Sequence, residues 1–127
     1  MPGFTNDAKN TMLAALVGLA TPTNTVTHIS LHTADPGSNG ASEVTGGDPA
    51  YARVAVTEAN WDAAANGEIT LAADTPFDGP AGGDATHMGI WDGTTFLGGG
   101  AITGDTTFNA EGDFVLQAGT RLDLNAA

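Results

Sequence analysis

Three histidines carry the most versatile chemistry in this sequence, because an imidazole can bind a metal ion or act as a base. His28 and His32 lie four residues apart in a segment whose alternating polar and apolar residues predict a strand. At about 3.3 Å per residue they would be roughly 13 Å apart, too far to share one metal ion. A site made by His28 and His87 would need adjacent strands, and no carboxylate is spaced to complete it. The histidines therefore predict no metal site.

Ser30 lies between two of these histidines, so a serine hydrolase has to be considered. No nucleophile elbow surrounds Ser30, and the acids that could pair for sugar cleavage fall in expected turns. The glycines at 98–100 lie inside an expected hairpin, which favours a bulge or a close backbone approach over a phosphate-binding loop. The sequence predicts no catalytic residue, no cofactor and no enzyme activity.

Oxygen-bearing side chains gather in residues 35–49, where turn-forming residues are dense and no apolar period is present. Asp35, Asn39, Glu43 and Asp48 could together hold calcium, although their spacing does not match the helix-loop-helix calcium pattern. The ordinary interpretation is that such residues hydrogen-bond the local backbone in turns. We expect a long exposed loop of the functional or mobile kind.

Three aromatic residues could form a binding surface. Tyr51, Trp61 and Trp91 either face outward, where sugar-binding and protein-binding surfaces use them, or are buried. A carbohydrate-binding module is therefore the alternative function to weigh. It predicts glycan affinity that is lost, without unfolding, when Trp61 or Trp91 is changed to alanine.

The charge balance excludes several partners. The 127 residues carry a net charge of −12, with 15 acids against Lys9, Arg53 and Arg121. This charge would repel phosphate backbones and anionic membranes, so neither nucleic-acid binding nor membrane insertion is expected. With no cysteine, the chain has no disulfide or thiolate metal site.

The elements that position these residues start with a helix. Thr5, Asn6 or Asp7 can cap it, and it should run to about Leu19 before Pro22. It is too short to cross a bilayer, and no targeting segment is evident. We expect it either to cover the core or to dock on a neighbouring subunit. Its apolar stripe consists of Met12, Leu13, Leu16, Val17 and Leu19.

Short strands should follow the helix, because 18 glycines and abundant threonine suit strands joined by turns. Ile29 and Leu31 alternate with polar residues, which predicts a half-buried first strand. The strongest local signal is a hairpin with an Asp-Gly turn at 92–93. The segment at 75–84 is rich in turn formers. The expected strands cover residues 26–34, 51–57, 68–73, 86–93, 94–103, 114–117 and 121–124.

About seven strands at this spacing predict a mainly β fold. We expect residues 1–127 to form a single domain, with a helical arm at 1–22 and an antiparallel β-sandwich or jelly-roll-like domain at 25–125. One short echo, Thr27-His28-Ile29 against Thr86-His87-Met88, would fit two paired central strands but is too short to indicate a duplication.

Longer strings carry a resemblance to a known family. The segments ISLHTADPG, NGASEVTGGDPAYARVAV and ATHMGIWDGTTFLGGGAIT resemble small tailed-phage proteins usually described as tail fibre or minor tail proteins. The most specific parts are His32–Pro36 and Glu43–Arg53. The resemblance implies a non-enzymatic virion protein, assembled in the host cytoplasm, either on the tail or as capsid decoration. It also implies other virion proteins as partners, namely major capsid or tail proteins, and a homo-oligomer.

In such an assembly the helix and the 35–49 loop should contact neighbours. A host-surface glycan would be a further partner, but no motif supports it. The candidate interface residues are Met12, Leu16, Asp35, Glu43, Tyr51, Arg53, Trp61 and Trp91.

Overall fold

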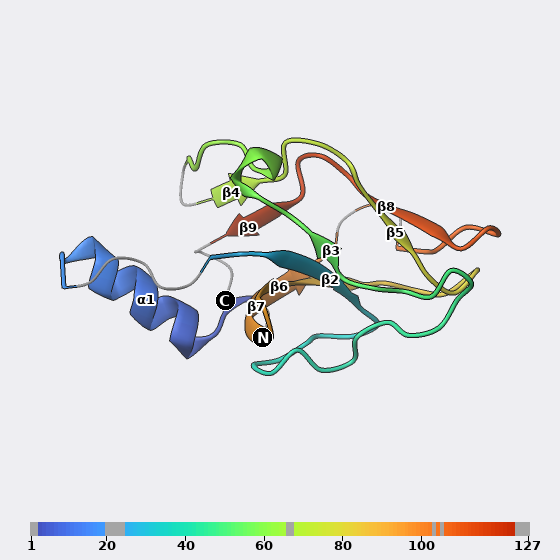
Figure 1. Ribbon diagram of the computed structural model, residues 1–127, viewed down its shortest axis with the longest axis horizontal. Coiled ribbons are helices and arrows are strands. Elements are labelled where there is room, and N and C mark those ends of the chain that lie inside the picture. The colour runs from blue at the N-terminus through green and yellow to red at the C-terminus, as the bar shows by residue number, and fades with distance from the viewer. Residues whose placement is uncertain (1–2, 20–24, 66–67, 103, 105, 124–127) are drawn as a thin grey trace.

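A five-stranded antiparallel sheet, ordered β1-β7-β6-β2-β3, is the main element of the fold (Figure 1). The structure is a computed structural model that describes the chain apart from residues 1–2, 20–24, 66–67, 103, 105 and 124–127. Pro22, which was predicted to stop the helix, and Leu124, the predicted end of the last strand, therefore lie outside the described residues. The strands of this sheet are β1 (Gly3–Phe4), β2 (His28–His32), β3 (Val54–Ala55), β6 (His87–Asp92) and β7 (Thr95–Ala101).

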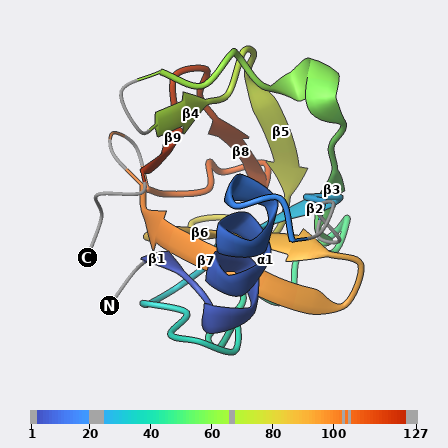
Figure 2. The same ribbon diagram turned by 90° about the vertical axis from the view of Figure 1, so that its left-hand side faces the viewer.

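A second layer covers one face of this sheet (Figures 1 and 2). It consists of two separate antiparallel ribbons and a 3₁₀ turn instead of one continuous sheet. The prediction of a mainly β, antiparallel fold with one helix is confirmed. The elements of this layer are β4 (Glu68–Thr70) with β9 (Arg121–Asp123), β5 (Thr75–Asp78) with β8 (Asp113–Leu116), and η1 (Glu58–Asn60).

Strand β5 corrects the prediction that residues 75–84 form only turns. Thr75 and Phe77 are buried while Pro76 and Asp78 are exposed, the alternation of a half-buried strand. A proline is tolerated because each strand of a two-stranded ribbon is an edge strand. Conversely, the strand predicted at 51–57 is longer than the one observed, because β3 contains only two residues.

The core lies between the two layers. Phe108 is almost fully buried and packs on Phe114, with ring centroids 5.2 Å apart. Burying such side chains is the main favourable term in folding, at about 25 cal/mol per Å² of apolar surface. The largest apolar side chains that are almost fully buried are Phe108, Ile29, Leu31, Leu71, Met88, Ile90 and Leu116.

Strands β2 and β6 are neighbours at the centre of the sheet, as their sequence echo predicted. Their register places His28 opposite Trp91 and His32 opposite His87. The prediction that β2 is half-buried was wrong, because four of its five residues are buried. Residues 33–50 cross the face opposite the second layer and cover the side that a bare strand would expose (Figure 1).

The predicted hairpin is confirmed. β6 ends at Asp92, which pairs with Thr95 of β7, and Gly93 and Thr94 form the turn between the two strands. The turn therefore lies one residue later than the predicted Asp-Gly pair. Gly98 on β7 shows why a glycine run lies inside this strand. A Cβ at Gly98 would collide with the backbone of Gly3 and Phe4 on β1, so the absence of a side chain allows β1 to complete the sheet.

Helix α1 (Asn6–Leu16) begins after Thr5, the first of the three caps that the sequence allowed, and ends earlier than Leu19. The Thr5 hydroxyl accepts a hydrogen bond from the Ala8 amide at 3.2 Å. Ala8 is the one buried residue of the helix, so of the two alternatives left open for the helix, the exposed stripe does not support covering the core. The helix projects from one end of the molecule (Figure 1). Within the described residues, no helix is long and apolar enough to cross a membrane.

Candidate functional site

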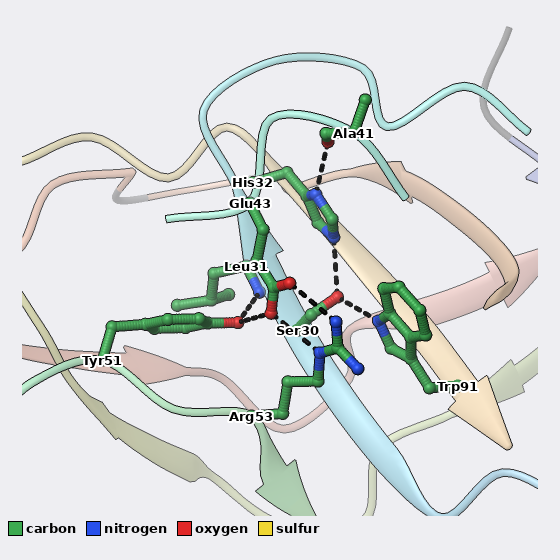
Figure 3. Close-up of polar contacts among 8 residues, drawn as sticks. All are labelled: Ser30, Leu31, His32, Ala41, Glu43, Tyr51, Arg53 and Trp91. Carbon is green, nitrogen blue, oxygen red and sulfur yellow. Dashed lines mark hydrogen bonds and ion pairs between the residues drawn. The ribbon is translucent and has the colours of Figure 1, made fainter. Parts of the chain in front are cut away.

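Six polar and aromatic side chains meet where the 35–49 loop crosses the central strands (Figure 3). We call this group the strap cluster, because it fastens the loop to the sheet. Four of its members were predicted as interface residues, whereas Ser30 and His32 were not. Its members are Ser30, His32, Glu43, Tyr51, Arg53 and Trp91.

The first half of the cluster is a chain of hydrogen bonds through a serine and a histidine. Trp91 Nε1 donates to Ser30 Oγ at 2.8 Å, and Ser30 Oγ lies 2.6 Å from His32 Nε2. His32 Nδ1 lies 2.7 Å from the Ala41 carbonyl oxygen, which can only accept. A neutral His32 therefore carries its proton on Nδ1 and accepts the Ser30 hydroxyl proton at Nε2.

This Ser30–His32 contact has the atoms of a nucleophile–base pair, but its surroundings make it structural. Both side chains are fully buried, and the serine oxygen is already bonded to Trp91. The group that orients His32 is a backbone carbonyl of the loop. Burial lowers the pKa of His32, so the neutral form that fits this chain of bonds is the one present at neutral pH.

The second half of the cluster is built around the Glu43 carboxylate. Arg53 donates to both of its oxygens, each at 2.9 Å, and the Tyr51 hydroxyl donates to Oε2 at 2.9 Å. Burial alone would raise the pKa of Glu43, but the bonds from Arg53 and Tyr51 outweigh it and lower that pKa. Burial raises the pKa of Tyr51, which keeps the phenol protonated and able to donate. The Tyr51 oxygen also accepts from the Leu31 amide at 2.9 Å.

Arg53 joins the two halves. Its guanidinium carbon lies 3.5 Å from the centroid of the Trp91 ring, a cation–π contact. Glycines leave the room that this packing needs. A Cβ at Gly40 would lie 2.7 Å from the Trp91 ring, and one at Gly89 would lie 2.6 Å from Ser30 Oγ. Tyr51 extends the cluster into the second layer, where its ring stacks on Phe77.

Together these contacts hold the loop against β2. Backbone bonds run from the Val44 amide to the Leu31 carbonyl at 3.0 Å and from the Thr33 amide to the Ser42 carbonyl at 2.8 Å. Val44 is buried, and Pro36 is almost fully buried. The loop is exposed along much of its length, as predicted, but it is anchored at these points.

Acid should loosen the strap cluster. The pKa of His32 is lowered in the folded protein, so its stabilising contribution is full above the unfolded value of about 6.5 and is lost as pH falls toward the folded pKa. We expect urea midpoints to decrease between about pH 7.5 and 5.5. His32→Gln should flatten this pH dependence, and an unchanged slope in that variant would contradict the assignment.

The calcium hypothesis does not gain support from the placement of its residues. Glu43 is engaged by Arg53 and Tyr51, and Asp35 accepts the Gly37 amide at 2.9 Å in a turn. That bond from Gly37 lowers the pKa of Asp35. Within the described ranges, no three histidine or acidic side chains gather as metal ligands would. His28 and His87 lie toward opposite ends of the β2–β6 pair, so the register does not bring them together.

The two tryptophans occupy different environments. Trp91 is 7% exposed, whereas Trp61 is partly buried and packs on the core beside the second layer. Of the two alternatives left open for Trp91, burial is the one found. The glycan test by alanine substitution without unfolding therefore remains usable for Trp61 alone, which weakens the carbohydrate-binding alternative.

Met12 and Leu16, predicted from the helix stripe, lie on α1 and are not part of the strap cluster. They line an apolar groove of about 470 Å³ between α1 and the sheet, together with Phe4, Ile90 and Leu97. Leu16 is 81% exposed. The structure thus divides the candidate interface residues between the helix, the strap cluster, the loop position Asp35 and Trp61.

Sequence reasoning missed the partnership of Ser30 and His32. The two lie at i and i+2 and so share one face of β2, a signal that was present. The sequence alone does not reveal the residues that bind this pair. Ala41, which binds His32, comes from the loop, and Trp91, which binds Ser30, comes from another strand.

Comparison with known proteins is consistent with this structural character. Residues 3–122 match the model of a family described as "Podophage GP4 fiber I protein gp80". A search of curated individual proteins found no match. The matched range covers nearly the whole chain and includes both the strap cluster and α1. The chain therefore belongs to this family of podophage fibre proteins, and it is a non-enzymatic structural component of the virion tail fibre.

Proposed function

We propose that the β domain acts as one rigid unit of the fibre and that α1 attaches it to a neighbouring virion protein. The observation that carries this proposal is the exposure of the helix stripe, which we call the α1 apolar face. An 11-residue helix is marginal in water without packing on its apolar side. Its exposed members on the helix are Met12 at 36%, Leu13 at 60% and Leu16 at 81%, and the stripe continues just beyond the helix with Val17 at 68% and Leu19 at 81%.

The strap cluster supports the rigid-unit part of this proposal. Every described side-chain nitrogen or oxygen that is fully buried has a hydrogen-bond partner, so the interior has no polar group waiting for a ligand. The 35–49 loop, held in place by this cluster, offers a second contact surface that includes Asp35. An anchored loop loses little conformational entropy when a partner binds it.

The position on the particle is tested by separating heads from tails and probing each fraction for this chain by mass spectrometry. We expect the chain in the tail fraction. Abundant copies on heads would instead favour capsid decoration, and absence from both would overturn the assembly role.

The role of α1 is tested in the same particles. Leu13→Asp should reduce incorporation into tails by roughly tenfold or more, because a charged side chain would replace an apolar one at the contact. Val115→Asp on β8 is the matched control, since Val115 is also an exposed apolar residue, at 47%, but lies outside the helix. Equal incorporation of both variants would count against α1 as the attachment.

A further inference from the structure

The 35–49 loop contains a chemically labile pair, Asn39 followed by Gly40. The side-chain amide of an asparagine can be attacked by the backbone nitrogen of the next residue. Glycine at that next position favours the attack, because it has no side chain to obstruct the approach and its backbone is the most adaptable. Asn39 is exposed, so solvent reaches its amide.

The reaction needs only water and base. The Gly40 nitrogen loses its proton to solvent base and bonds to Asn39 Cγ, and the side-chain nitrogen takes up a proton and leaves as ammonia. The product is a succinimide ring. Water then opens the ring at one of its two carbonyl groups, which gives either aspartate or isoaspartate.

The anchored loop holds the attacking nitrogen away from this reaction. The Gly40 amide donates to the Pro36 carbonyl oxygen at 3.1 Å, and the Ala41 amide donates to the same oxygen at 3.0 Å. Gly40 has a φ of +77° and lies so close to Trp91 that a Cβ there would be 2.7 Å from the ring. Because its proton is bonded and its backbone is packed, the Gly40 nitrogen is not free to turn toward Asn39 Cγ.

Isoaspartate at position 39 would not fit the anchored loop. In isoaspartate the backbone runs through the former side chain, which adds a methylene group to the main chain before Gly40. The loop is fixed on both sides of this point. Pro36 is almost fully buried, and the Ala41 carbonyl oxygen lies 2.7 Å from His32 Nδ1 (Figure 3). A longer main chain between these anchors would move the Ala41 carbonyl away from His32.

We propose that Asn39 is a deamidation site under the control of the strap cluster. Modification is slow while the 35–49 loop is anchored and begins when the loop opens. Isoaspartate then prevents the loop from closing again. The rate depends on the contacts that anchor the loop, since the Asn39 side chain is already exposed in the anchored state. This modification site is independent of the attachment proposed for α1.

Peptide mapping of the full chain tests the proposal. The chain is incubated in mildly alkaline buffer, folded or in urea, and digested with trypsin. Asn39 lies in the peptide 10–53, and the second Asn-Gly pair of the sequence, at 66–67, lies in the peptide 54–121 and serves as an internal reference. We expect Asn39 to deamidate roughly tenfold or more slowly in the folded chain than in urea. The cleavage sites are Lys9, Arg53 and Arg121.

Variants test whether the strap cluster sets this rate. In folded Glu43→Ala, deamidation at Asn39 should accelerate toward its rate in urea, while the rate at 66–67 stays the same. Glu111→Ala removes an exposed carboxylate outside the loop and should change neither rate. Circular dichroism shows whether each variant folds. If Glu43→Ala does not fold, Tyr51→Phe removes one hydrogen bond to Glu43 and should accelerate Asn39 by a smaller factor.

The outcomes test each step separately. No deamidation of Asn39 in urea would overturn the site itself, and equal rates in the folded and unfolded chain would overturn its control by the loop. The chain that has formed isoaspartate should show faster hydrogen exchange at the Val44 amide. Asn39→Asp adds the charge without the methylene group and should exchange like the unmodified chain. Equal exchange in these two forms would overturn the claim that isoaspartate holds the loop open.

Discussion

Replacing Trp91 with alanine is expected to lower the free energy of unfolding by about 3 to 5 kcal/mol, the range typical of a buried aromatic residue. Trp91 fills the space under Gly40, packs edge-on against Phe96 at 5.1 Å and donates to Ser30. Alanine would leave a cavity and remove the hydrogen bond, and the Arg53 guanidinium would lose the ring beneath it. Urea unfolding followed by circular dichroism measures the change.

Two controls separate the sources of this loss. Trp91→Phe keeps an aromatic ring but cannot donate to Ser30, so it should cost about 1 to 2 kcal/mol. Trp61→Ala removes the other tryptophan from a partly buried position and should cost less than Trp91→Ala. Equal losses at the two tryptophans would show that Trp91 contributes no more to the free energy of unfolding than a partly buried tryptophan outside the strap cluster does.

Local patterns were sufficient where the structure depends on neighbours in sequence. The Asp-Gly signal predicted the β6–β7 hairpin, whose turn residues are Gly93 and Thr94, and Thr5 is one of the three caps that the sequence offered for the helix. The echo between the His28 and His87 segments also marked a true strand pair. These features depend on backbone preferences that a few adjacent residues determine.

Longer-range features were beyond such patterns. The strand at Phe77 was missed because Pro76 and the glycines after it have the composition of a turn, and only pairing with β8 makes it a strand. The burial of His32 depends on the 35–49 loop, which returns over β2 and places the Ala41 carbonyl against the imidazole. The exposure of Leu16 could not be predicted either. An apolar helix stripe has the same sequence pattern whether it packs on the protein's own core or on a partner.

The strap cluster and the α1 apolar face then have complementary roles. Glu43, Arg53 and Tyr51 satisfy one another inside the chain, which turns a loop rich in glycine and acids into part of a rigid body. The helix is left with its apolar side unsatisfied inside the chain. The proposed function uses both properties, because a rigid domain would fix the positions of its neighbours and the exposed apolar face of α1 would attach it to one of them.

Glu43→Ala is the second change with a large expected effect, a loss of about 2 to 3 kcal/mol in unfolding free energy. It would leave Arg53 over Trp91 without its partner and the Tyr51 hydroxyl without its acceptor. The figure is below that of a fully buried pair because the side chains of Glu43 and Arg53 are 22% and 31% exposed. Hydrogen exchange at the Val44 amide should accelerate as the loop detaches.

A second ion pair, between Glu68 and Arg121, offers a matched control. Glu68 and Arg121 lie 3.5 Å apart with side chains 30% and 62% exposed, so Glu68→Ala should cost at most about 1 kcal/mol. If both glutamate variants lost the same stability, the Glu43 pair would be an ordinary surface contact. If Glu43→Ala lost stability without faster exchange at Val44, the carboxylate would support the sheet rather than the loop. The expected combination, a large loss with faster exchange confined to the strap, follows because a single carboxylate accepts the side-chain hydrogen bonds that Arg53 and Tyr51 donate to the loop.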